Sequence, residues 1–233
     1  MIRAVVFDLD HTLFDRHATL RAIVPALRAR FSVPPSFTDK EIGDAWTYAD
    51  DSYVYDGWQY IFGCLQEKGI LPQDAQYADY RTFIYEQFAK TAVRFDDTLP
   101  MLETLRDRGY KIALITNGNH ALQYKKLELT GMAYIFDEII VSGDVGVDKP
   151  EKEIFLMMCE KLGFAPEETV YVGDNPIADI DGAAGAGMKT VRILSTNRHI
   201  FGRRTPDETV ETVREIPDAV ERIRKKYEED DRN

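Results

Sequence analysis

Short apolar runs alternate with helical patterns along the chain from about Thr98 onward. The runs predict buried strands, and the segments between them repeat apolar residues at helical spacing. Strands are expected at residues 111–115, 138–141, 170–172 and 190–194. Helices are expected at residues 121–130, 150–162, 177–186 and 216–226. Strands that alternate with helices predict a parallel sheet with helices on both faces.

The first apolar run of the chain ends in two acidic residues. Val6 and Phe7 lead directly into Asp8 and Asp10. Two carboxylates are therefore expected at the carboxyl end of a buried strand, where parallel α/β sheets bind their ligands. Like charges so close together repel, and burying them is costly unless a cation or hydrogen-bond donors compensate. The pair requires a metal ion, a shared proton or a basic partner.

The segment between this strand and the rest of the sheet has a different pattern. From about Asp15 to Arg94 the apolar residues follow helical spacing, and no segment has a convincing strand pattern. We expect a helical domain of about four helices at residues 15–95, inserted into a core formed by residues 1–14 and 96–233. An insert that leaves the sheet directly after the aspartate pair suits a lid that closes on substrate.

Composition and charge narrow the classes of partner. The 233-residue chain carries a formal net charge of -11, which argues against binding a nucleic-acid polymer but allows a small anionic substrate. Its two cysteines form no paired framework, which fits a reducing compartment. The sequence contains no apolar run of membrane length and no signal-peptide pattern. We expect a cytoplasmic monomer or homodimer without a membrane partner.

The later strands also end in polar residues that are expected at the same edge of the sheet. They are Thr116, Asn117 and Gly118 after the second strand, Lys149 after the third, and Asp174 and Asp179 after the fourth. Taken singly, they have ordinary explanations as helix caps or a solvated lysine. Taken together, the carboxylates suit Mg²⁺, the lysine and turn N–H groups suit phosphoryl oxygens, and an aspartate can act as nucleophile. This chemistry indicates metal-assisted phosphoryl transfer.

Four segments resemble, in order, the four motifs of the haloacid dehalogenase superfamily. They are VVFDLDHTL, ALITNG, the pair Lys149-Pro150, and VYVGDNPIAD. The helical insert resembles the C1 cap of that superfamily. The resemblance implies a Rossmann-like sheet with strand order 5-4-1-2-3, which places the first and fourth strands side by side.

The same resemblance implies distinct roles for the two aspartates of the first motif. Asp8 would be the nucleophile that forms an aspartyl-phosphate, and Asp10 would protonate the leaving oxygen and then activate water. Mg²⁺ would be bound by Asp8, the main-chain carbonyl of Asp10, and Asp174. Asp10 favours a phosphatase or phosphomutase over a dehalogenase, because a halide leaves without a proton and an alkoxide benefits from one.

The resemblance also implies which residues hold the phosphoryl group. They would be Thr116, Asn117, Gly118 and Lys149, supported by Asp179 and Thr12. Lys149 would also screen the repulsion among the carboxylates, and Asp179 would orient Lys149 or the water shell of the metal.

The substrate is expected to be a small phosphorylated metabolite. Segments 118–123, 127–131 and 142–146, together with Lys149-Pro150, are similar to the noncanonical pyrimidine nucleotidase group, which favours a nucleoside 5'-monophosphate. Tyr53 and Tyr55 are candidates for stacking on a base, although aromatic residues of the insert also suit its own core. The alternatives are a sugar-phosphate or phosphoglycolate phosphatase, a phosphomutase, and a phospho-receiver or binding module without enzyme activity.

Overall fold

The computed structural model describes residues 1–53, 57–195 and 201–230. Within these residues, six strands form one parallel sheet in the order β3-β2-β1-β4-β5-β6. The strands are β1 (Ala4–Phe7), β2 (Lys111–Thr116), β3 (Glu138–Val141), β4 (Thr169–Gly173), β5 (Lys189–Ile193) and β6 (Glu208–Val210). The expected α/β class and the order of the first five strands are confirmed.

The sixth strand, β6, extends the sheet beyond β5 and was not expected from the sequence. It has only three residues, and of these only Val210 is buried. So short a segment has no alternating pattern to distinguish it from a loop. Its pairing with β5 comes from tertiary contact rather than from a local signal.

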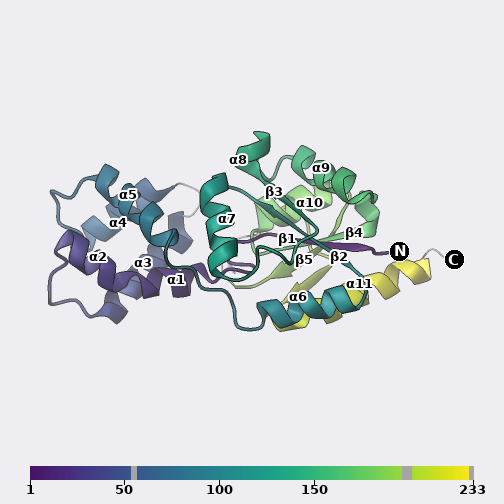
Figure 1. Ribbon diagram of the computed structural model, residues 1–233, viewed down its shortest axis with the longest axis horizontal. Coiled ribbons are helices and arrows are strands. Elements are labelled where there is room, and N and C mark those ends of the chain that lie inside the picture. Colours follow the sequence, from purple (N-terminus) through teal and green to yellow (C-terminus); the bar gives the residue numbers. More distant parts are fainter. Residues whose placement is uncertain (54–56, 196–200, 231–233) are drawn as a thin grey trace. The chain divides into compact units, whose positions relative to one another are not determined.

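Helices cover both faces of the sheet, as the alternating pattern predicts (Figure 1). α9 and α10 pack on one face, where their apolar residues join a buried cluster with Val6, Ile115 and Tyr171. α6 and α11 lie on the other face, next to each other. The α-helices that follow the strands in this part of the chain, or precede β2, are α6 (Thr98–Asp107), α7 (His120–Leu129), α8 (Ser142–Val145), α9 (Lys152–Leu162), α10 (Gly182–Gly185) and α11 (Ile216–Asp230).

Three of the expected helices differ from the sequence-based prediction by more than one residue. α9 begins at Lys152 rather than at Pro150, because the Glu151 N–H bonds to the carbonyl of Asp148 and closes a turn that holds Lys149 and Pro150. The expected helix 177–186 is divided into a wider π-helical segment, Pro176–Asp181, and α10. α11 continues four residues beyond the expected end at residue 226, and its mixed charges are typical of a solvated helix face.

By its internal contacts, the chain divides into two compact units, Met1–Phe14 with Arg94–Asn233, and Asp15–Val93. The second unit is helical throughout its described residues, which form five α-helices where about four were expected. They are α1 (Arg16–Ala22), α2 (Val24–Phe31), α3 (Asp39–Tyr53), α4 (Trp58–Glu67) and α5 (Tyr77–Phe88). In its core the buried Trp46 donates a hydrogen bond to the hydroxyl of Tyr80, at 2.9 Å. None of the helices in the described part of the chain is long and apolar enough to span a membrane.

The register of the sheet brings three strand ends to one edge. β1 lies between β2 and β4, with Phe7 opposite Leu114 and Val172. The residues that follow these strands therefore meet where β1 ends. The Asp8 N–H continues the ladder by donating to the carbonyl of Val172, which fixes the start of the Asp8 segment.

Candidate active site

A buried lysine lies between two carboxylates at the carboxyl end of β1. Lys149 Nζ is 2.6 Å from Asp8 Oδ1 and 2.6 Å from Asp179 Oδ1. All three side chains are almost completely buried. The positive charge is therefore compensated on both sides, as a buried charge requires. The structure brings together three residues that the sequence places far apart.

The backbone of Lys149 is held in place from the neighbouring strand end. The Asn117 side chain donates to the Lys149 carbonyl at 3.0 Å and accepts from the Lys149 N–H at 2.9 Å. This pair of hydrogen bonds joins the turn after β2 to the turn before α9. The side chain of Asn117 therefore positions Lys149, whereas the sequence suggested contact with phosphate.

Tyr171 is a member of the cluster that the sequence did not single out. Its hydroxyl lies 2.9 Å from Lys149 Nζ and 3.2 Å from the carbonyl of Ile115, and the residue is fully buried. Burial raises the pKa of Tyr171 well above its usual range, so the phenol stays neutral. A tyrosine within an apolar strand gives no sequence signal beyond β-propensity, and its role depends on the sheet register.

Asp179 is oriented by its own turn and by the close approach of β4. Its Oδ2 accepts the N–H of Asn175 at 3.0 Å, while Asn175 caps the following helical segment. A Cβ atom on Gly173 would lie 2.3 Å from Asp179 Oδ2, so only glycine leaves room for this carboxylate. Gly173 thus ends β4 without displacing the Asp179 carboxylate from the cluster.

Three carboxylates form an acidic group that suits a hard cation. Oxygens of Asp8, Asp174 and Asp179 lie within 4.8 Å of one another. Burial raises the pKa of Asp8 to about 8; Lys149 opposes this shift, and the charges of Asp179 and Asp174 add to it. Both Asp179 oxygens accept hydrogen bonds from the protein, whereas Asp8 and Asp174 directly follow the adjacent strands β1 and β4, where hard carboxylate oxygens suit Mg²⁺. The donor set therefore fits the predicted metal.

Asp10 lies in a tight turn that begins directly after Asp8. The carbonyl of Leu9 accepts N–H groups of the turn, including that of Phe14 at 2.9 Å, and His11 adopts a left-handed conformation (φ 62°). The Asp10 carboxylate faces Lys126, whose Nζ lies 2.7 and 2.8 Å from its two oxygens. The two aspartates of the motif thus have separate lysine partners.

Lys126 and its neighbour Gln123 were missed in the sequence analysis, although they carry a signal. Both lie on the buried face of α7, where Leu127 and Thr130 continue the i, i+3, i+4, i+7 pattern. Polar side chains at core positions of a helix need partners, which indicates a polar site behind the helix.

The other predicted phosphate-binding groups are used within the protein in this structure. The buried Thr116 hydroxyl contacts the amide of Gln123. The Gly118 N–H, predicted to face an anion, donates instead to Ser142 Oγ at 3.0 Å. The buried Thr12 hydroxyl has no hydrogen-bond partner among the described residues, so it is available to a group that enters beside Asp10.

The aromatic residues of the insert divide between core and surface. Trp46 and Phe62 are buried, whereas Tyr48 and Tyr60 are largely exposed. Tyr53 is partly exposed and stacks on Tyr60, with ring centroids 5.9 Å apart. Tyr55 lies outside the described residues, and substrate contact by Tyr53 stays a prediction.

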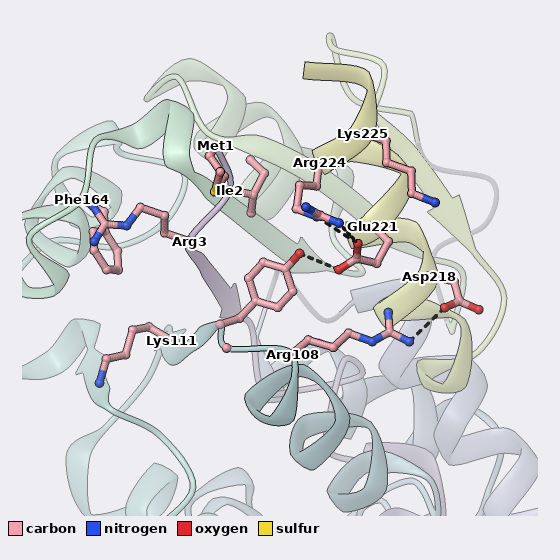
Figure 2. Close-up of a pocket in the computed structure, with 12 residues that line it drawn as sticks. Met1, Ile2, Arg3, Arg108, Lys111, Phe164, Asp218, Glu221, Arg224 and Lys225 are labelled. Carbon is pink, nitrogen blue, oxygen red and sulfur yellow. Dashed lines mark hydrogen bonds and ion pairs between the residues drawn. The ribbon is translucent and has the colours of Figure 1, made fainter. Parts of the chain in front are cut away.

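A separate pocket lies at the opposite, amino-terminal end of the strands (Figure 2). Two pairs of its charged side chains form ion pairs: Arg108 with Asp218 at 3.2 Å, and Arg224 with Glu221 at 2.8 Å. None of the predicted site residues is among the described residues that line it. The acidic strand ends, rather than this pocket, carry the candidate chemistry.

The structure combines a Rossmann-like parallel α/β sheet with an acidic site at the carboxyl ends of its strands, an arrangement typical of phosphoryl-transfer hydrolases. The sequence matches the family model of haloacid dehalogenase-like hydrolases over residues 2–187. A glyceraldehyde 3-phosphate phosphatase of Methanopyrus kandleri is 30% identical over 237 positions, covering 97% of this chain and 100% of the relative. The pyrophosphatase PpaX of Bacillus pumilus is 36% identical over 192 positions, covering 82% of this chain and 83% of the relative.

A solved structure gives the same result. A haloacid dehalogenase (HAD) phosphatase from Thermococcus onnurineus is 30% identical, with a TM-score of 0.63 over 94% of this chain and 98% of that chain. The chain belongs to the haloacid dehalogenase-like hydrolase family. The predicted family is confirmed, and the protein is an enzyme of the hydrolase class.

Proposed function

We propose that this enzyme is a Mg²⁺-dependent phosphatase that hydrolyses a small phosphate monoester through an aspartyl-phosphate on Asp8. The observation that carries the proposal is the buried group of Asp8, Lys149, Asp174 and Asp179 at the strand ends. Two relatives that the chain matches over most of its length are named as phosphatases, which supports phosphate-ester chemistry.

In the first step, the Asp8 carboxylate bonds to phosphorus while the bond from phosphorus to the ester oxygen breaks. Asp10 donates its proton to that oxygen, so that a neutral alcohol leaves. In the second step, Asp10 accepts a proton from water as the water oxygen bonds to phosphorus. The bond between Asp8 and phosphorus then breaks and releases inorganic phosphate. The net reaction consumes one water and leaves both aspartates as they began.

Asp8 must be ionised to attack, although burial alone favours its neutral form. Lys149, at 2.6 Å, stabilises the ionised carboxylate and supplies positive charge for the phosphoryl oxygens. Asp8, Asp174 and the main-chain carbonyl of Asp10 would hold Mg²⁺. The ion, when bound, neutralises developing charge on the phosphoryl group.

The sequence similarity of segments 118–123 and 142–146 favours a nucleoside 5'-monophosphate as substrate. A second candidate is a small phosphorylated sugar or triose, because the Methanopyrus kandleri relative is named for glyceraldehyde 3-phosphate. The Bacillus pumilus relative is named for pyrophosphate, so members of similar sequence are named for different substrates. Family membership therefore indicates the class of reaction, and the identity of the substrate has to be measured.

A metal-dependence assay with a substrate panel tests the proposal. The protein is freed of metal with EDTA and assayed for phosphate release from p-nitrophenyl phosphate, nucleoside 5'-monophosphates and glyceraldehyde 3-phosphate. We expect no turnover with EDTA, recovery with Mg²⁺, and the highest kcat/KM for a nucleoside monophosphate. Full activity in EDTA contradicts the metal requirement. A higher kcat/KM for the triose phosphate favours the second candidate.

A further inference from the structure

We infer that Lys126, together with Gln123, is the positioning residue for Asp10 and holds its carboxylate for proton transfer to the leaving group. This inference rests on the proposed function, because it concerns how the same site delivers a proton. It gives α7, which carries none of the four motifs, a role in positioning the proton-transfer group.

The contacts fix the Asp10 carboxylate from one side. Lys126 Nζ lies 2.7 Å from Asp10 Oδ1 and 2.8 Å from Oδ2, and Gln123 Nε2 lies 3.2 Å from Oδ2. Three contacts to two oxygens restrict both rotation of the carboxylate plane and movement of the side chain. Proton transfer needs this restriction, since a shift of about 1 Å in a reacting group can cost about 100-fold in rate.

Burial distinguishes this pair from a surface salt bridge. The Lys126 side chain is 3% exposed, whereas that of Asp10 is 24% exposed. The lysine is therefore enclosed by protein, while the carboxylate that it holds keeps an accessible side. The ammonium also lies 4.9 Å from the ring centre of Phe14, within reach of a cation–π interaction. The Asp10 carboxylate, which must contact the substrate, is thus held by a lysine that is shielded from solvent.

The contacts of Gln123 connect Asp10 to a predicted phosphate-binding residue. Its amide nitrogen lies close to the Thr116 hydroxyl and 3.0 Å from the carbonyl of Asn117, in addition to Asp10. One side chain of α7 therefore spans the turn after β1 and the end of β2. Gln123 and Lys126 are three residues apart on the same face of the helix, so α7 presents them together.

A stabilising role alone does not account for this arrangement. Burying a charged pair is costly, and replacing both partners of such a pair by apolar residues is often neutral or stabilising. The lysine instead stabilises the negative charge that Asp10 acquires as its proton leaves, a charge that develops in the transition state. Lys126 should therefore affect rates most where the leaving group needs a proton.

The test is the dependence of kcat/KM on the leaving group. Wild-type protein and Lys126→Met are assayed with Mg²⁺ on monoesters ranging from p-nitrophenyl phosphate to alkyl phosphates. We expect Lys126→Met to lower kcat/KM about 10- to 100-fold for alkyl phosphates. The loss should be several-fold smaller for p-nitrophenyl phosphate, because nitrophenolate leaves without a proton. Lys126→Arg, which keeps the charge, should recover part of the loss.

Lys125→Met is the matched control. Lys125 is the neighbouring residue on α7; its side chain is 44% exposed and pairs with Glu128 at 2.7 Å. It should show wild-type kcat/KM for every substrate. Urea unfolding of all variants measures whether Lys126→Met is less stable than the wild type. A loss of stability alone would lower kcat/KM for all substrates by the same factor and leave the leaving-group dependence unchanged.

A double-variant cycle shows whether Lys126 acts through Asp10. In an Asp10→Asn background, Lys126→Met should cause little further loss, because the group that it positions no longer transfers a proton. The inference would be overturned if Lys126→Met lowered kcat/KM equally for all leaving groups, or if the losses from the two substitutions were additive in the double variant. Neither result would affect the proposed function, which the activity of the wild-type protein supports. An inactive wild-type protein would instead overturn the proposed function.

Discussion

Asp8 and Asp10 are two residues apart, but their side chains have different surroundings. Asp8 is buried beside Lys149 and near Asp174, where a nucleophile and a metal ligand are needed. Asp10 is more exposed and contacts Lys126, where a group that exchanges protons with a substrate is needed. The proposed division of roles thus has a structural basis in two separate lysines.

Lys149→Met should remove most activity and lower stability. The substitution leaves Asp8 and Asp179 buried without their shared cation, which costs about 3–5 kcal/mol when one partner of a buried pair is lost. Urea unfolding measures the stability, and phosphate release from p-nitrophenyl phosphate measures the rate, which we expect to fall more than about 100-fold. Lys152→Met, at an exposed position of α9, is the control and should leave both unchanged. Wild-type turnover in Lys149→Met would make Lys149 an ordinary structural charge.

At the scale of elements, the site depends on how strands end. β4 ends in Gly173 so that Asp179 can approach from the following turn, and the turn before α9 is joined to the end of β2 through Asn117. These connections place side chains from separate motifs within hydrogen-bond distance. The positions of the strand ends were predictable from the short apolar runs, whereas the helix after Lys149 was wrongly expected to begin at Pro150 instead of Lys152.

Gly173→Ala should disturb the site while leaving the sheet in place. The added methyl group would lie 2.3 Å from Asp179 Oδ2, so that carboxylate must move and release its contact with Lys149. We expect kcat to fall about 10- to 100-fold, with far-ultraviolet circular dichroism like that of the wild type. Gly185→Ala, where a Cβ meets no atom within 4 Å, is the control. Unchanged kcat in Gly173→Ala would show that the position of Asp179 is not critical.

At the scale of the whole molecule, the sheet was largely predictable and the site only in part. Its strands are continuous apolar runs, and their order followed from resemblance to a family. β6 was missed because three residues carry no periodicity, and Tyr171 because its neighbours depend on register. Lys126 was missed because a lysine in a helix is ordinarily solvated, so its place in the i, i+3, i+4, i+7 pattern of α7 was overlooked.

The amino-terminal end of the sheet contributes to stability in a pH-dependent way. Partial burial raises the pKa of Glu221, but the hydrogen bonds from Tyr110 and Arg224 outweigh it and hold the pKa below the usual value of 4.5. The ionised carboxylate therefore stabilises the fold above pH 4.5, and this contribution is lost as pH falls through the lowered pKa.

Glu221→Gln should lower the free energy of unfolding by about 1 kcal/mol at neutral pH. The difference from the wild type should shrink as the pH falls below 4.5, because protonation of Glu221 then removes the same interaction in both proteins. Urea unfolding of both proteins at several pH values measures this difference in the free energy of unfolding. A difference that stays constant across this range would show that the ionised form of Glu221 contributes no specific stabilisation.

Replacement of the nucleophile is the most direct test of the central claim. Asp8→Asn keeps the size of the side chain but removes the charge that attacks phosphorus. Phosphate release from p-nitrophenyl phosphate is measured with Mg²⁺ for the wild type and the variant, and circular dichroism confirms that both are folded. We predict that wild-type protein turns over and that Asp8→Asn releases no phosphate above background. Turnover at the wild-type rate in Asp8→Asn would contradict an aspartyl-phosphate mechanism.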